Sequence, residues 1–223
     1  LLRTKEEELK VAAANVGSWL RVGGELTFDR RSGEEIIWAR SLQLIEPKNR
    51  LDLAKQKRVE LHLHTQMSSL DATTRLADLF SLVSKWGHKA VAITDHGSVQ
   101  AFPEAYELSR HYGIKVIYGL EGYLVDDDEG DPLADKAPVY HIILLAKNQK
   151  GIKNLYRLVT LSHLDYFHRL PRIPRTVLKR YREGLILGSA CEAGELFQAL
   201  LCNSNKKKIE ELATFYDFLE IQP

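Results

Sequence analysis

The sequence predicts an α/β fold for most of the chain, preceded by a β-hairpin. From residue 59 onward, short apolar runs alternate with segments whose apolar residues recur at helical spacing. Before residue 46, two stretches alternate apolar and polar residues with period two on either side of a turn signal. Strands that alternate with helices over short connections indicate a parallel sheet, either open or closed into a barrel.

The composition is that of a soluble globular domain. The 223 residues are 44% hydrophobic and 27% charged, which excludes a disordered tail, a fibre and a disulfide scaffold. Lys plus Arg is 31 and Asp plus Glu is 30, for a formal net charge of +1, so the overall charge predicts no attraction to nucleic acid or membranes. Any polyanion contact would need a local basic patch.

The cysteines and the ends of the chain suggest a cytoplasmic fragment. Only Cys191 and Cys202 are present, which fits a reducing compartment. No apolar run reaches the roughly 18 residues of a membrane span, so we expect no membrane partner. The chain begins at Leu1 without an initiator Met, which suggests a piece of a longer protein.

The N-terminal region predicts a hairpin with strands over 19–29 and 35–45 and a turn at 29–33. Two strands alone are marginal in water, so we expect the hairpin to be the end of a small β-barrel with strands upstream of Leu1. A polar linker follows between Glu46 and Arg58. We therefore divide the chain into domains over 1–50 and 51–223.

The second domain is expected to alternate strands and helices along its length. Residues 126–138 interrupt the alternation with an acidic, Gly- and Pro-containing stretch that predicts an exposed loop. The expected strands cover 59–64, 90–94, 115–118, 142–146, 185–187 and 218–221, and the expected helices cover 75–86, 103–112, 152–159, 195–201 and 207–216.

His62 and His64 lie in the first of these strands, two positions apart. Side chains at i and i+2 share one face of a strand, so both imidazoles could bind one metal ion. Two histidines hydrogen-bonded in a core are the alternative. Asp71 lies where a loop could fold back over the same metal, or it could cap the helix that follows.

Further candidate ligands follow later strands. Asp95 and His96 come after strand 90–94, Glu121 after strand 115–118, and Cys191 after strand 185–187. The carboxyl ends of parallel strands are where ligands gather in α/β folds. His141 does not fit this rule, since it precedes its strand. Imidazole, carboxylate and thiolate together predict a site for zinc, manganese or iron.

Several motifs carry a family resemblance. Residues 58–65 (RVELHLHT), 93–97 (ITDHG), 119–122 (GLEG) and 187–191 (LGSAC) resemble successive motifs of the PHP (polymerase and histidinol phosphatase) domain. Residues 67–72, 86–88, 102–106 and 170–175 are similar to the PolC-type alpha subunits of bacterial DNA polymerase III. The hairpin resembles the end of the OB-fold that precedes the PHP domain there.

The resemblance implies a distorted (β/α)7 barrel, here partial, that binds up to three divalent metal ions. Asp95 would not bind a metal itself but would orient the imidazole of a residue that does. The family's last two ligands, in an Asp/Asn-x-His motif, would lie beyond Pro223, so weak or absent phosphodiesterase activity is expected of this chain. The implied ligands are His62, His64, Asp71, His96, Glu121, His141 and Cys191.

The implied function is that of a fragment of a replicative DNA polymerase. The parent enzyme would use Mg²⁺, DNA and deoxynucleotides and contact replisome subunits such as the sliding clamp. The metal site would be structural, or a phosphoesterase or 3'-5' exonuclease in which Asp71 and His96 help to place or deprotonate a water. A stand-alone PHP phosphatase acting on a small phosphomonoester is the alternative.

Two features of the sequence bear on nucleic acid. PolC enzymes carry an exonuclease domain inserted near the position of residues 126–138, and this acidic stretch is too short to hold one. Arg169, Arg172 and Arg175 form the densest basic stretch and could contact DNA phosphates, or could simply be solvated.

Overall fold

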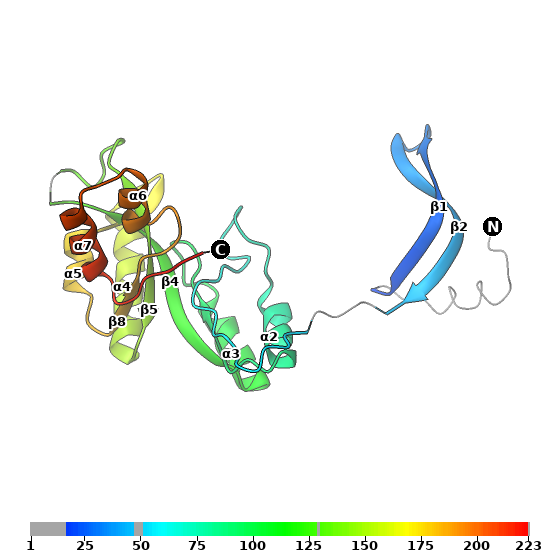
Figure 1. The fold of residues 1–223 in the computed structure, drawn as a ribbon, viewed down its shortest axis with the longest axis horizontal. Helices are drawn as coiled ribbons and strands as arrows, with labels where there is room; N and C mark the ends of the chain where they lie inside the picture. Colours follow the sequence, from blue (N-terminus) through cyan, green and yellow to red (C-terminus); the bar gives the residue numbers. More distant parts are fainter. Residues whose placement is uncertain (1–16, 47–50, 129, 223) are drawn as a thin grey trace. The chain divides into compact units, whose positions relative to one another are not determined.

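The computed structural model describes residues 17–46, 51–128 and 130–222. The chain divides into two compact units, with the boundary between Asp52 and Leu53. Figure 1 shows the elements of both units, which are described separately below.

The first unit contains the predicted hairpin. β1 (Trp19–Asp29) pairs antiparallel with β2 (Glu34–Ile45), and a bulge interrupts the register at Gly23 and Gly24. A Cβ atom at Gly24 would lie 2.3 Å from the Trp38 carbonyl oxygen, so the bulge needs glycine there. The register places one set of apolar side chains on the same face, all of them at least partly exposed: Leu20, Val22, Leu26, Phe28, Ile37, Leu42 and Leu44.

The second unit alternates strands and helices, as predicted. Its first half contains α2 (Leu76–Lys85), β3 (Ala90–Ile93), α3 (Phe102–Tyr112), β4 (Lys115–Val125), β5 (Val139–Ala146) and α4 (Gln149–Leu164). Its second half contains β6 (Phe167–His168), β7 (Leu170–Pro174), α5 (Arg175–Arg180), β8 (Leu185–Gly188), α6 (Glu195–Leu201) and α7 (Lys206–Phe215). The arrangement is that of a partial, distorted α/β barrel.

The sheet is mixed, which corrects the expectation of a parallel sheet. Its strand order is β6-β7-β4-β5-β8, and β3 pairs with the first half of β4. β3 and β7 run parallel to β4, whereas β5 runs antiparallel to both β4 and β8. The reason is the connection between β4 and β5. The described residues of this connection form no crossover helix, and a crossover of that kind is what usually returns the chain in the parallel direction.

Apolar packing holds β4 in place from two sides. Figure 1 shows α2 and α3 on one side of β4 and α4 to α7 on the other. Phe80 of α2 and Ile93 of β3 are fully buried in the first cluster, and Leu120, Leu144 and Leu178 in the second. Each such side chain contributes about 1.5–3 kcal/mol on burial. The middle of β4 is therefore held in place by apolar packing on both sides.

β4 continues well past its expected end at residue 118, so Glu121 lies in the middle of a strand. The glycines near it, Gly119 and Gly122, serve close packing. A Cβ atom at Gly119 would lie 2.7 Å from Leu145 Cδ2 and 2.8 Å from Thr94 Cγ2. The strand can pass here only because position 119 has no side chain.

Two expected strands, 59–64 and 218–221, form only single parallel bridges, to β3 and β8 respectively. In both segments, a backbone N–H beyond the bridge donates to a side-chain hydroxyl of the neighbouring strand or the residue after it, instead of to a backbone carbonyl. The Leu63 N–H donates to Thr94 Oγ1 at 2.7 Å, and the Glu220 N–H donates to Ser189 Oγ at 2.9 Å. The two segments therefore follow the edge of the sheet without forming full strands.

Candidate metal centre

Glu121 is the centre of the site. Glu121 is fully buried, and it lies opposite Ile143 in the pairing of β4 with β5. One carboxylate oxygen lies 2.6 Å from His64 Nε2 and 3.0 Å from His62 Nε2, and the other lies 2.9 Å from His141 Nδ1. A carboxylate this deeply buried requires compensating charge, and here three imidazoles surround it.

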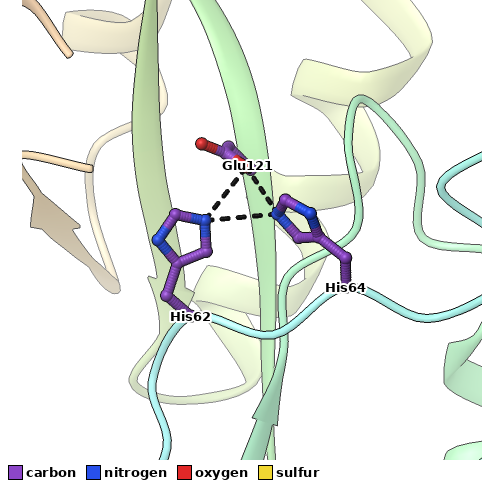
Figure 2. A group of neighbouring side chains, drawn as sticks. All are labelled: His62, His64 and Glu121. Carbon is purple, nitrogen blue, oxygen red and sulfur yellow. Dashed lines mark hydrogen bonds and ion pairs between the residues drawn. The ribbon is translucent and has the colours of Figure 1, made fainter. Parts of the chain in front are cut away.

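His62 and His64 approach Glu121 from the segment beside β3. Their rings lie on the same side of the backbone, as the i, i+2 spacing predicts, and Figure 2 shows both pointing toward the carboxylate of β4. Their Nε2 atoms are 3.2 Å apart. The two rings and Glu121 therefore converge on one small volume.

His96 and Asp71 form the more exposed side of the cluster. His96 Nδ1 lies 3.4 Å from a Glu121 oxygen and is buried without a hydrogen-bond partner, and its Nε2 lies 3.5 Å from Asp71 Oδ2. Asp71 also lies 2.8 Å from His64 Nδ1. It does not cap α2, where Arg75 stands at the N-cap position without a side-chain bond.

His141 and Cys191 complete the cluster. Cys191 Sγ lies 3.4 Å from His141 Nδ1 and 3.8 Å from a Glu121 oxygen. His141 lies near the start of β5. It reaches the site because β5 runs antiparallel to β4, which places the start of β5 beside the end of β4 and pairs His141 with Tyr123. The mixed sheet thus explains the one residue that did not fit a parallel arrangement.

Asp95 lies outside the ligand cluster and is linked to His96 through Ser68. It is buried and accepts hydrogen bonds from the Thr65 N–H at 2.6 Å, the Thr65 hydroxyl at 2.8 Å and the Ser68 hydroxyl at 2.7 Å. Among the described residues, no imidazole contacts it. The Ser68 hydroxyl accepts from the His96 backbone N–H at 3.1 Å, so Asp95 stabilises the turn that positions His96.

Glu220 belongs to the surroundings of the site but was missed by the sequence analysis. Its carboxylate oxygens lie 2.8 and 3.0 Å from His62 Nδ1. The two residues are 158 positions apart, and no motif links them. In the sequence, the only indication of Glu220 was that it is a single acid within the apolar run Phe218-Leu219-Glu220-Ile221.

The electrostatics of the cluster favour bound protons when metal is absent. Burial alone would lower the pKa of His62, but hydrogen bonds to Glu121 and Glu220 outweigh it and raise that pKa to about 10. Hydrogen bonds to Cys191 and Glu121 raise the pKa of His141 to about 9. Burial would raise the pKa of Glu121, yet hydrogen bonds from the three imidazoles keep it lowered. His96 differs, since burial lowers its pKa.

These residues fit a divalent metal. His62 and His64 each face a carboxylate at Nδ1, where a neutral ring would hold its proton, so the lone pair of Nε2 then points at the Glu121 oxygen. Acceptors that face acceptors in this way need either an added proton or a cation between them. Three overlapping sets of donors lie within 4.8 Å: His62–His64–Glu121, His64–Asp71–His96 and His96–Glu121–His141. Imidazole and carboxylate together, beside a thiol, suit transition metals.

The loop at 126–138 holds a second acidic cluster of similar spacing, Asp126, Asp127 and Asp128. The loop is mostly exposed, as predicted, but these aspartates have partners on α5. Asp126 lies 3.4 Å from Arg175 Nε, Asp127 accepts from the Thr176 N–H at 3.0 Å, and Asp128 lies 3.3 Å from Lys179 Nζ. The carboxylates therefore fasten the start of the loop to a helix.

The structure corrects the expectation that Arg172 and Arg175 contact DNA. Both residues are buried. Arg172 donates to two backbone carbonyls of the 126–138 loop at 2.7 and 2.9 Å, and Arg175 pairs with Glu195. Neither guanidinium is free to meet a phosphate. Arg169 is exposed, but it lies 3.5 Å from Asp135.

Fold and site together define an α/β domain with a candidate metal centre. Residues 60–222 match the family model of the PHP domain, so the chain belongs to the PHP domain family. Among the described residues, no helix has the length and apolar character needed to cross a bilayer. The family match begins after the hairpin, and the OB-fold origin of the hairpin stays a prediction.

Curated relatives extend the similarity to the whole chain. It is 29% identical to a DNA polymerase III PolC-type of Caldanaerobacter subterraneus subsp. tengcongensis, in an alignment that takes in 100% of this chain and 30% of the relative. It is 25% identical to that of Bacillus subtilis, over 99% of this chain and 29% of the relative. The chain therefore spans less than a third of the length of these relatives.

The alignment with the Caldanaerobacter relative runs over 416 positions. This chain has 223 residues, and 416 less 223 leaves at least 193 positions without a counterpart in it. A solved structure of a metal-dependent phosphoesterase from Bifidobacterium adolescentis shares 24% identity at a TM-score of 0.33, covering 46% of this chain and 34% of that one. That likeness is too low to add to the family assignment.

Proposed function

We propose that this chain is a segment of a PolC-type replicative DNA polymerase whose PHP unit holds a cluster of divalent metal ions around Glu121. The single observation that carries the proposal is the buried Glu121 carboxylate, shared by the imidazoles of His62, His64 and His141. The similarity of the whole chain, hairpin included, to PolC-type polymerases supports the same conclusion.

The proposed ligands are those that the sequence analysis named. They are His62, His64, Asp71, His96, Glu121, His141 and Cys191, and zinc, manganese and iron match this donor set. Bound divalent ions in such a site lower the pKa of coordinated water and neutralise charge on a phosphate. We therefore assign phosphoester hydrolysis to this site.

Asp71 and His96 are proposed to act on the water. The Asp71 side chain is half exposed, and it faces both His64 Nδ1 and His96 Nε2. His96 has a lowered pKa, so its ring stays neutral near pH 7 and can take up a proton. The pair lies on the more open side of the cluster, where a phosphoester would approach.

The activity of the longer protein is part of the proposal. DNA-directed DNA synthesis with Mg²⁺, DNA and deoxynucleotides, and contacts to replisome subunits such as the sliding clamp, would belong to the parent polymerase in the cytoplasm. A stand-alone phosphatase acting on a small phosphomonoester is the alternative, but the similarity of the N-terminal region to polymerases favours the first function.

We also propose that loop 126–138 stands where the relatives carry the residues without a counterpart here. Inserted domains need an exposed loop whose two ends lie close together. β4 and β5, which flank the loop, are hydrogen-bonded neighbours up to the pair Val125–Val139. The two ends of the loop are therefore adjacent, which suits an insertion such as an exonuclease domain.

Metal analysis and hydrolysis assays test the hydrolytic function. The protein should retain zinc, manganese or iron after purification and, as part of the longer polymerase, hydrolyse single-stranded DNA faster than p-nitrophenyl phosphate. Asp71→Asn should lower hydrolysis at least about tenfold. Asp78→Asn, which removes an exposed acid on α2, should leave it unchanged.

Three results would contradict the proposal. Protein that retains and takes up no metal would overturn the metal site. Bound metal with no hydrolysis of either substrate would leave the site a structural one. Turnover of the small phosphomonoester alone would favour the phosphatase.

A further inference from the structure

Glu220 lies beside the candidate metal centre without belonging to any of its donor sets. Both of its carboxylate oxygens face His62 Nδ1, at 2.8 and 3.0 Å. This nitrogen is on the opposite side of the ring from Nε2, which faces Glu121 and His64. Glu220 therefore contacts the far side of a proposed ligand.

The position of Glu220 is fixed by β8 and the residues after it. The Phe218 N–H donates to the Leu187 carbonyl at 3.2 Å, and the Ser189 N–H donates to the Phe218 carbonyl at 3.2 Å. The Glu220 N–H then donates to Ser189 Oγ at 2.9 Å. The carboxylate itself accepts from Gln222 Nε2 at 2.8 Å. These bonds hold the acid at one place along the edge of the unit.

The contact joins two parts of the chain that line one cavity. This cavity of about 500 Å³ is lined by residues 58–62 and 218–222. His62 and Glu220 are both among the lining residues, and their side chains are in contact. The segment after α7 is thereby tied to the segment that carries the first histidine of the site.

A carboxylate that accepts at Nδ1 determines which nitrogen of His62 is free. An ionised carboxylate can only accept hydrogen bonds, so Nδ1 must carry a hydrogen, and in the neutral ring that a metal binds the lone pair is then on Nε2. Carboxylates that accept from the far nitrogen of a ligand imidazole fix both its tautomer and its ring orientation. Asp71 makes the same contact with His64 Nδ1, but it also faces His96, whereas among the described residues no second ring contacts Glu220.

We infer that Glu220 is a positioning residue of the metal centre, which holds His62 with Nε2 directed at the metal. The inference rests on the proposed metal site and adds a residue outside its ligand set. Glu220 lies in the segment after α7, so the geometry of the centre depends on the docking of this segment against β8.

The test uses Co²⁺ and Zn²⁺ as probes of the folded chain. Glu220→Gln should lower the affinity for Co²⁺, measured by competition with a chelator, about 10- to 100-fold and alter the visible spectrum of the bound ion. Glu210→Gln removes the same charge from an exposed position on α7 and should change neither. Glu220→Asp, which keeps the charge on a shorter side chain, should fall between the two and serves if Glu220→Gln does not fold.

Proton NMR gives a readout that a merely structural role would not move. In the Zn²⁺-loaded protein, the His62 Nδ1–H should exchange slowly with water, and Glu220→Gln should accelerate its exchange at unchanged thermal stability. Equal Co²⁺ affinity and an unchanged Nδ1–H signal in the variant would overturn the inference while the metal site stands. A wild-type protein that binds neither ion would overturn the proposed metal site, and this inference with it.

Discussion

Glu121 and the aspartates at 126–128 lie at the middle and just past the end of the same strand, β4. Each belongs to a group whose possible ligand atoms lie within 4.8 Å of one another. Around Glu121 the neighbours are ring nitrogens, and two of these rings also face a carboxylate on their far side. Around the aspartates the neighbours are Arg175, Lys179 and a backbone N–H. Spacing alone therefore does not identify a metal site, whereas the partners of each carboxylate do.

Burial explains why the two groups differ. Position 121 of β4 lies between Ile143 of β5 and the bridge to His96, and it is fully buried. An acid there loses its water and must be matched by charge from within the site. Past Val125 the chain enters an exposed loop, where water and surface cations satisfy each carboxylate singly. Five experiments can break or sharpen this contrast.

The largest effect is expected from Glu121→Gln, which removes the charge shared by three imidazoles. Outer carboxylates of metal sites typically account for 10- to 100-fold in affinity, so loss of a central ligand should lower Zn²⁺ affinity by about 100-fold or more. Asp128→Asn in the loop is the matched control and should change it less than about twofold. Isothermal titration of both variants measures the contrast, and comparable losses in the two would refute it.

Metal affinity should depend strongly on pH. The pKa of His62 is raised to about 10 and that of His141 to about 9, so both rings carry a proton near pH 7 that a metal must displace. Affinity should therefore rise between pH 6 and 8, about tenfold per pH unit for each proton displaced. Titrations in two buffers of different ionisation enthalpy would count these protons. A flat pH profile would contradict the protonated state of the metal-free site.

The same shifts fix the pH dependence of stability in the metal-free protein. The contribution of His62 to the free energy of unfolding is fully present below pH 6.5 and is lost as the pH rises through about 10. Denaturant unfolding of the metal-free protein between pH 6 and 10 should show this decline. In His62→Gln, which lacks the titrating ring, the decline should be smaller.

A smaller effect is expected at the loop. Asp127 accepts from the Thr176 N–H in the first turn of α5, the contact that an N-cap residue makes. Asp127→Ala should lower the free energy of unfolding by about 1 kcal/mol, with Zn²⁺ affinity unchanged. Thermal denaturation with and without metal separates the two quantities. If metal affinity fell as well, the loop and the centre would be one structural unit.

The smallest change to the fold should follow cleavage of the loop. Residues 130–138 are mostly exposed, and the loop separates two hydrogen-bonded strands, so limited proteolysis should cut first between Asp126 and Pro138 and leave both pieces associated. Metal affinity should survive the cut. First cleavage elsewhere in the second unit would count against the loop as the place of an insertion.

The sequence by itself determined the hairpin and most helices of the second unit, whereas β6, β7 and α5 were not expected from it. Helices at 76–85, 102–112 and 195–201 lie within a residue or two of their expected bounds, because helical spacing of apolar side chains is a local property. The common direction of His62 and His64 follows from their spacing alone. The hairpin likewise follows from alternation with period two.

Only the tertiary structure decided which distant residues meet. The direction of β5 brings His141 to the site, and the extension of β4 through Gly119 puts Glu121 inside a strand. The docking of the segment after α7 on β8 brings Glu220 to His62. Pairing between strands and packing between segments depend on the whole chain, whereas the periodic patterns of a sequence describe one segment at a time.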